Sequence, residues 1–214
     1  MKRITITLCA AAFLFACKSE VKPEVKVASA SDDASNAKEQ WKVVDTATAN
    51  KNWYAYMTPG KEHEMLAKSN GEWTSDMTMW MEADGQPMKS TGTATNKMIM
   101  GGRYQLSTHK SSFGDMPFEG ISTAGFDNHK KVYISSWIDN MGTGMMTMEG
   151  TWDEATKSIN FKGKMVCPGN GQEWDVRETY KIVDDNTHIM EMYGPDPKTG
   201  KEYKNMVITF TRKK

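Results

Sequence analysis

Residues 71–82 read GEWTSDMTMWME, and the alternation within this stretch decides the predicted fold. Side chains of a β-strand point to opposite faces in turn. One face of the stretch therefore collects Trp73, Ser75, Met77, Met79 and Met81, and the other collects Thr74, Asp76, Thr78, Trp80 and Glu82. Because the first set is mostly apolar, the stretch predicts a strand with one buried face, ended by the turn residues Gly85-Gln86-Pro87.

The same rhythm continues to the end of the chain. Besides 71–84, we predict strands at 88–99, 103–113, 118–126, 131–139, 144–153, 157–166, 173–183, 187–193 and 202–212. Short links rich in Gly, Pro, Asn and Asp separate them. This spacing predicts an all-β fold: a barrel of about ten antiparallel strands in up-and-down order, whose closure leaves no free edge. A two-sheet sandwich stays open as the alternative.

One or two short helices are expected before the sheet. Residues 47–56 form the first candidate, and TPGKEHEMLAKSNG at 58–71 forms the second, with Thr58 as its cap and Pro59 at its first position. His63 is expected on the solvated side of that helix. Trp80 is the odd large apolar residue on the outer strand face, and we expect it under the helix at 60–69.

The turn at Asp184-Asp185-Asn186 fixes the predicted register of the two strands that it joins. A three-residue loop would place Glu178 opposite Met192, and Ile182 opposite His188, with both Glu178 and His188 facing inward. A two-residue loop would instead turn His188 outward. An inward histidine is what a haem-binding barrel needs, although lone histidines of this kind are more often paired polar residues. Glu178 and His188 are therefore candidate ligand-binding residues.

Methionine replaces leucine as the core residue of this chain. Seventeen of the 18 methionines lie at or beyond Met57, whereas Leu66 and Leu106 are the leucines beyond the N-terminal segment. Met is flexible and polarisable, so it suits an adaptable interior. Thioethers also bind soft metals such as Cu(I). Three methionines on one strand face span roughly 13 Å, too far for one ion without help from another strand. Packing is the favoured interpretation, and no metal residue is assigned.

The segment SSWIDNMGTG places Trp137 and Asp139 on one face beside a glycine-rich loop. They are candidates for an aromatic wall with a polar anchor at the barrel mouth. The competing interpretation is a packed Trp and a turn-capping Asp. Arg103 follows two glycines and is a candidate second anchor. The sequence shows no Ser-His-Asp arrangement and no phosphate-binding glycine loop, so we predict no catalytic residue, no cofactor and no enzyme activity.

The N-terminal sequence predicts that the protein is located in the bacterial envelope. Lys2 and Arg3 precede a short apolar run, typical of a secretory signal peptide over residues 1–16. Leu14-Phe15-Ala16-Cys17 resembles a lipobox, which implies lipidation of Cys17 and attachment to a membrane. Lys18 after the cysteine favours the outer membrane. Residues 17–40 lack aromatic side chains and are predicted to be a flexible tether, followed by one domain over 41–214.

Charge and cysteine content narrow the possible partners. The 27 basic side chains, less Lys2 and Arg3, leave 25 against 27 acidic ones, and this balance argues against nucleic acid. Cys9 falls in the signal peptide and Cys17 is the lipidation residue, so Cys167 has no partner for a disulfide. The expected partners are therefore a membrane, through the lipid, and a small molecule.

Two resemblances extend this interpretation. Gly71-Glu72-Trp73 and the late Arg212 resemble the lipocalin-like (calycin) superfamily, in which the Trp plugs one barrel end and the Arg stacks over it. More widely, GEW, MGGRYQLS, residues 118–154, IVDDNTHIMEMYG and GKEYKNMVITFTR are similar to the bacterial family named domain of unknown function 1579. The resemblance implies a calycin-like barrel and no catalytic residue.

Together these features predict a lipid-anchored barrel that binds a small apolar or amphipathic molecule. Two alternatives stay open. The barrel could be filled by its own side chains and serve as a structural or interaction module, or it could carry a soft metal or haem.

Overall fold

The computed structural model describes residues 41–214. The predicted signal peptide (1–16), the predicted tether (17–40) and Cys17 lie outside the described residues. Residues from Val44 to Lys214 form one compact unit. Its elements are α1 (Thr46–Met57), α2 (Lys61–Ala67), β1 (Gly71–Met79), β2 (Met88–Ile99), β3 (Tyr104–Phe113), β4 (Met116–Asp127), β5 (Val132–Asp139), β6 (Met146–Asp153), β7 (Ser158–Val166), β8 (Glu173–Asp184), β9 (Thr187–Pro195) and β10 (Glu202–Arg212).

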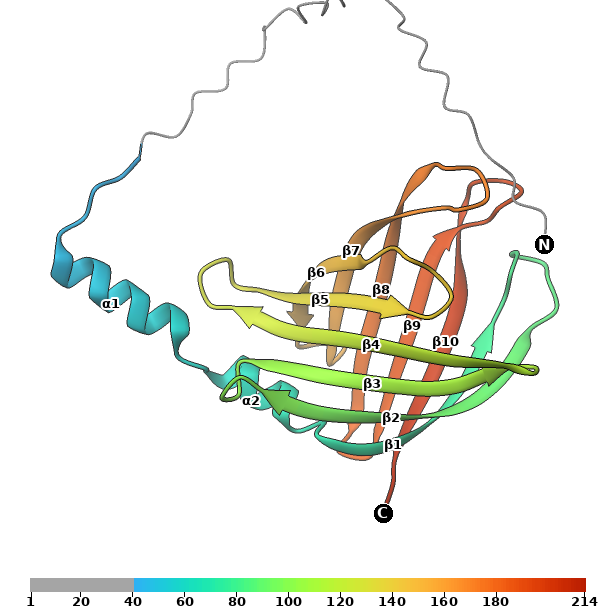
Figure 1. The fold of residues 1–214 in the computed structure, drawn as a ribbon, viewed down its shortest axis with the longest axis horizontal. Coiled ribbons are helices and arrows are strands. Elements are labelled where there is room, and N and C mark those ends of the chain that lie inside the picture. The colour runs from blue at the N-terminus through green and yellow to red at the C-terminus, as the bar shows by residue number, and fades with distance from the viewer. Residues whose placement is uncertain (1–40) are drawn as a thin grey trace, which may run out of the picture. The chain divides into compact units, whose positions relative to one another are not determined.

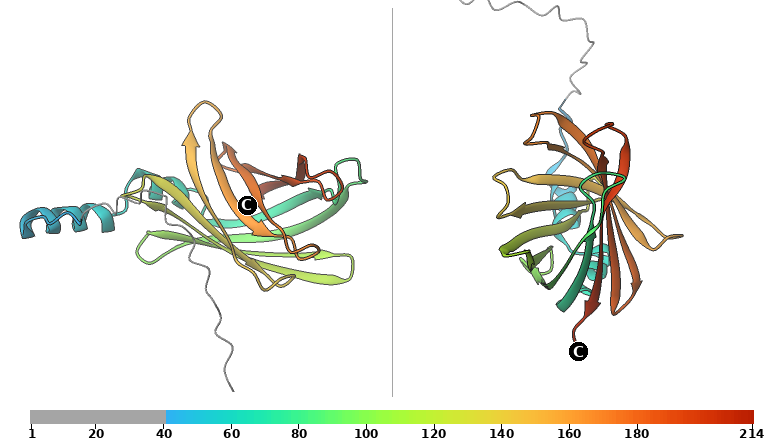
Figure 2. Two further views of the ribbon diagram at one scale, coloured as in Figure 1. Left: turned by 90° about the horizontal axis from the view of Figure 1, so that it is seen from above. Right: turned by 90° about the vertical axis from the view of Figure 1, so that its right-hand side faces the viewer.

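The ten strands form a closed antiparallel barrel in up-and-down order (Figure 1). Each strand pairs with the next along the chain, and β1 also pairs with β10, from Trp73 opposite Arg212 to Met79 opposite Met206. Figure 2 shows the curved wall from two further sides. The predicted barrel is confirmed, and closure rules out the sandwich because neither the first nor the last strand leaves a free edge.

The first strand is shorter than predicted, and this corrects two expectations. β1 ends at Met79, so Met81 lies beyond the wall with 63% of its surface exposed. The Trp80 N–H donates to the Asn205 carbonyl, and the Trp80 carbonyl accepts a bond from the Tyr203 hydroxyl. Trp80 therefore lies one strand length away from α2, not beneath it.

The helix boundary also differs from the prediction. Thr58 ends α1, where its hydroxyl donates to the Tyr54 carbonyl, and Gly60 caps α2. The Gly60 N–H donates to Nδ1 of His63, which is 5% exposed and packs against Phe126. His63 is thus buried rather than solvated, because it serves as the acceptor that satisfies the helix start.

The C-terminal end of α2 is held to the barrel by buried polar side chains. The Ser69 carbonyl accepts bonds from the Trp73 indole and from Asn96. Gln105 donates to the Leu66 carbonyl at 2.6 Å and to the Ser69 hydroxyl at 2.7 Å. The last carbonyls of a helix have no partners within the helix, so the bond to Leu66 satisfies one of them. Together with the bonds to Ser69, just beyond the helix, it fixes α2 against one end of the barrel.

Two apolar clusters fill that end. Leu66 of α2 packs with inward side chains of β5 to β8, namely Tyr133, Met148, Ile159, Phe161 and Val176. A second cluster joins Trp73, Ala94 and Phe210 from β1, β2 and β10. The core is therefore concentrated where α2 and Trp73 close the barrel.

Helix α1 contributes no buried residue. Its C-terminal end is attached to the barrel by Asn128, whose amide donates to the carbonyls of Ala55, Tyr56 and Thr58. No helix within residues 41–214 is both long and apolar enough to cross a membrane.

Candidate ligand-binding lumen

A row of methionines crosses the inner wall of the barrel. Met79 pairs with Met88 on β2 and with Met206 on β10, and Met206 pairs with Met192 on β9. Directly opposed residues of neighbouring strands share a face, about 5 Å apart between Cβ atoms. The four side chains therefore form a continuous band of thioethers over four strands, which we call the methionine row.

The accessible surface of inward side chains divides the interior into two halves. Near α2 the side chains are packed: Trp73 is 1% exposed, Ile159 2% and Phe161 5%. Along the methionine row, Met79, Met192 and Met206 are half-buried although they point inward. The side chains near α2 are thus packed, whereas those of the methionine row keep surface that a water-sized molecule can reach.

Glu178 continues the methionine row on β8. It pairs with Met192 on one side and with Phe161 on the other, so both of its cross-strand neighbours are apolar. Among the described residues its carboxyl has no hydrogen-bond donor and no cation within ion-pair distance. Burial raises the pKa of Glu178 to about 7. Trp174, on the same face of β8, has a buried indole N–H that likewise lacks a partner among the described residues.

The predicted register of the β8–β9 hairpin is confirmed, although the turn that produces it differs from the predicted one. β8 and β9 are joined through Asp185 and Asn186, and a bulge at Val183 restores the pairs Ile182–His188 and Glu178–Met192. The bulge inserts one extra residue, which has the same effect on register as the three-residue loop predicted from sequence. Both Glu178 and His188 consequently face inward.

His188 lies in a packed stack at the closed end. The Tyr180 hydroxyl and Nδ1 of His188 are 2.8 Å apart, and the His188 ring centre lies 4.6 Å from that of Trp73. Arg212 lies over Trp73 and donates to the carbonyls of Lys68, Asn70 and Asp185. Burial lowers the pKa of His188 to about 4, so the ring is neutral. A histidine that is 3% exposed and stacked against Trp73 is poorly placed for a haem iron.

Trp137 and Asp139 form a pair whose polar atoms are already used. The Trp137 indole donates to one carboxylate oxygen of Asp139 at 2.7 Å, and the Met141 N–H donates to the other at 2.9 Å. The Trp137 ring occupies the space beside Gly120, where a Cβ would overlap it. It also contacts Phe118 and His109. Asp139 therefore caps a turn and Trp137 packs among aromatic side chains, and a role of the pair in ligand binding stays a prediction.

No role was predicted for His109 from the sequence. Its ring lies 5.2 Å from Trp137 and 5.9 Å from Phe210, measured between ring centres. Burial lowers the pKa of His109 to about 4. The alternation of β3 places it on the inner face, but only the register with β2 and β4 shows that aromatic rings surround it.

Arg103 is separated from the other four predicted residues. Its guanidinium donates to the Met100 carbonyl at 3.1 Å. Together with Thr58, Tyr104 and Ile134 it lines a shallow cavity of about 250 Å³ against the outer face of β3 to β5. The structure therefore groups Glu178 with the methionine row, His188 with the closed end and Trp137 with Asp139, whereas Arg103 lies outside the barrel.

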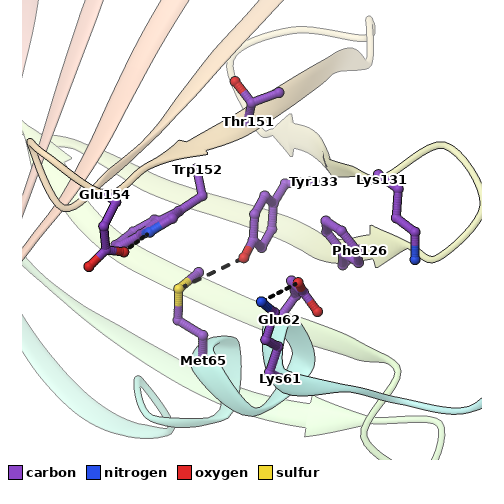
Figure 3. Close-up of a pocket in the computed structure, with 9 residues that line it drawn as sticks. All are labelled: Lys61, Glu62, Met65, Phe126, Lys131, Tyr133, Thr151, Trp152 and Glu154. Carbon is purple, nitrogen blue, oxygen red and sulfur yellow. Dashed lines mark hydrogen bonds and ion pairs between the residues drawn. The ribbon is translucent and has the colours of Figure 1, made fainter.

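A second cavity, of about 460 Å³, lies between α2 and the end of β4 to β6 (Figure 3). Met65, Phe126, Tyr133 and Trp152 form its apolar wall, and Lys61, Glu62, Lys131 and Glu154 place charges around it. Two of its polar wall groups are paired: the Tyr133 hydroxyl contacts the Met65 sulfur, and the Trp152 indole donates to Glu154. The sequence missed this cavity because its walls meet only after folding.

A model of the family described as protein of unknown function (DUF1579) matches residues 58–212, which hold α2 and the whole barrel. The chain belongs to this family. The family match confirms the resemblance to DUF1579 that was found in the sequence. A comparison with curated proteins found no match.

Two solved structures have folds similar to that of this DUF1579 protein. Rv2717c from M. tuberculosis is 10% identical with a TM-score of 0.56, and the match covers 73% of this chain and 100% of that one. The S-type phycobiliprotein lyase CPES from Guillardia theta is 10% identical with a TM-score of 0.52, covering 76% of this chain and 97% of that one. At such identity the likeness shows the fold alone.

Proposed function

We propose that this DUF1579 protein is an envelope lipoprotein that reversibly binds a small apolar or amphipathic molecule against its methionine row. The observation that carries the proposal is the part-exposed state of Met79, Met192 and Met206 inside a closed wall. Burying about 200 Å² of apolar ligand surface would contribute roughly 5 kcal/mol before the entropic cost of association is subtracted. Flexible thioethers can adapt to the shape of the guest.

The methionine row supports this proposal more strongly than the cavity beside α2. Cavities that bind small molecules combine an apolar wall with a few polar groups that fix the ligand. The cavity beside α2 has its Tyr133 and Trp152 polar groups already paired, whereas the row ends at the unpaired Glu178. The row therefore offers both apolar contact and a free polar group.

The experiment is native mass spectrometry of the full chain extracted from membranes, with detergent removed in the gas phase. We expect a co-purified molecule of a few hundred daltons. Met79→Asn/Met206→Asn should lose it, and the exposed pair Met116→Asn/Met141→Asn should keep it. Consistently empty protein that also takes up no fatty alcohol would refute the proposal. Because one structural neighbour is named a lyase, the released molecule should also be checked for chemical change.

A soft-metal site is the second candidate, favoured by the same row. One strand alone spreads its thioethers too widely, but Met79, Met192 and Met206 come from three neighbouring strands. Titration with Cu(I) distinguishes the candidates. Met79→Leu/Met206→Leu conserves apolar volume and removes two thioethers, so it should retain ligand binding. If it instead abolishes a tight Cu(I) site that Met116→Leu/Met141→Leu retains, the metal function is the right one.

The membrane anchor is tested separately. Cys17→Ala should abolish labelling by a palmitate analogue and move the protein from the membrane to the soluble fraction. Attachment through an acylated N-terminus requires at least two chains to be stable. Unchanged labelling and fractionation would remove the lipoprotein part of the proposal and leave the ligand part standing.

A further inference from the structure

Glu178 is an acidic group set into an apolar wall. Its cross-strand neighbours are Phe161 and Met192, and Val176 and Tyr180 flank it on the same face of β8. The next residue in the row beyond Met192 is Met206. Glu178 lies deep in the wall but keeps some accessible surface. Its carboxyl therefore faces the open half of the lumen.

Within residues 41–214, the groups that face Glu178 supply no compensating charge. On β8 the neighbouring titratable side chain is Tyr180, whose hydroxyl is bonded to His188 of β9. The inward residues of β7 and β10 closest in register are Phe161 and Met206, which are apolar. Arg212 is committed to Trp73 and to three backbone carbonyls at the closed end.

An unpaired carboxylate in such a place is costly, because its apolar neighbours exclude much of the water that would hydrate it. A bound cation would offset this cost, because it pairs with the carboxylate directly. Thioether sulfur is polarisable and is compatible with a nearby positive charge. The raised pKa of Glu178 agrees with this arrangement, since the empty barrel favours the protonated form.

We propose that the lumen takes a primary or secondary amine with an apolar body, and that Glu178 is the residue that binds its nitrogen. This inference rests on the proposed function, because it assigns the polar end of the molecule held by the methionine row. The apolar body lies along Met192 and Met206, and the ammonium group donates to the Glu178 carboxylate. The ligand class is thus a cationic amphiphile rather than a fatty acid.

The test compares octylamine, octanol and octanoate, which share one chain and differ in the head group. Binding to the full chain in lipid nanodiscs is followed by ligand-observed NMR, with empty nanodiscs subtracted. At pH 8 we expect octylamine to bind at least tenfold more tightly than octanol and octanoate. Glu178→Gln should weaken octylamine at least tenfold and leave octanol unchanged. The control Glu191→Gln, which changes an outward carboxylate paired with Lys204, should change nothing.

The pH dependence supplies a measurement that needs no variant. Octylamine requires the ionised carboxylate, so its affinity should fall as the pH is lowered from 8 to 5, approaching tenfold per unit below the titration of Glu178. Octanol affinity should stay flat over the same range. Glu178→Gln should make the octylamine profile flat as well.

The outcomes separate the two proposals. If octanol or octanoate binds as tightly as octylamine, or if Glu178→Gln has no effect, the assignment of an amine is wrong while binding at the methionine row stands. If none of the three molecules binds, the proposed function fails together with it.

Discussion

The guanidinium carbon of Arg212 lies 4.3 Å from the centre of the Trp73 ring, which joins the last strand of the barrel to the first. The same side chain donates to backbone carbonyls of the segment between α2 and β1 and of the β8–β9 turn. One residue thus ties together the closed end, the helix that covers it and the pair of strands that completes the wall.

Removing Arg212 should destabilise the fold. Arg212→Ala loses a cation–π contact and several hydrogen bonds, and we expect the free energy of unfolding to fall by about 2–4 kcal/mol. Urea unfolding followed by tryptophan fluorescence measures this change. Arg177→Ala is the matched control, since Arg177 lies over Tyr193 and pairs with Glu202 on the outer surface, and it should cost about 1 kcal/mol or less. Equal losses would contradict the role given to Arg212.

Gly120 should not tolerate a side chain while Trp137 is present. A Cβ at this position would overlap the indole ring, so Gly120→Ala should lower the free energy of unfolding by about 1–3 kcal/mol. In a Trp137→Ala background the same change should cost much less, and a double-mutant cycle measures the difference. Gly142→Ala, which meets no atom within 4 Å, is the control.

Two inward-facing histidines should make the barrel sensitive to mild acid. Burial lowers the pKa of His109 and of His188 from 6.5 to about 4. Between these values the unfolded chain binds protons that the folded chain does not, so stability falls as the pH drops from 6.5 towards 4. Between pH 7 and pH 5, His109→Leu should reduce this fall by up to about 2 kcal/mol. Urea midpoints at pH 7 and pH 5 test it, and a fall of the same size in the variant would contradict the prediction.

Glu178 should have the opposite effect on stability, lowering it as the pH rises. Its pKa is raised from 4.5 to about 7, so the folded state holds a proton that the unfolded state releases. The stability that this provides is complete below pH 4.5 and is lost as the pH rises through 7. Glu178→Gln should therefore stabilise the ligand-free barrel at pH 8, by up to about 3 kcal/mol, and have little effect at pH 4. Urea unfolding at pH 8 and at pH 4 measures both effects. Glu191→Gln, measured in the same way, should show no such gain at pH 8.

Much of the wall could be predicted from the sequence because its information is local. The alternation around Trp73 and Met79 fixes a strand and its faces, and turn residues mark most of the ends. The inward direction of Glu178 was also predicted, although through a three-residue loop where the chain uses a bulge at Val183. The alternation of apolar and polar residues is the same whether a longer loop or a bulge sets the register, so the sequence cannot distinguish the two.

The missing parts depend on contacts between distant segments. Asn96 and Gln105 read as ordinary strand residues, yet they bond the end of α2. His63 looked solvated because nothing near it in the sequence shows that Phe126 covers it. The cavity beside α2 and the grouping of Met79 with Met206 and Met192 likewise arise from pairing across the barrel.

Closure between β1 and β10 has a consequence for the order in which the chain can be completed. The edge of β1 that is destined for β10 has no partner until residues 202–212 are available, more than a hundred positions later. Until then the chain carries an open strand edge and an uncovered Trp73, both of which invite aggregation. Final assembly is therefore a late, non-local step of the kind that slows folding. Loss of the last strand should expose the protein to proteases as an unfinished sheet rather than as a shortened barrel.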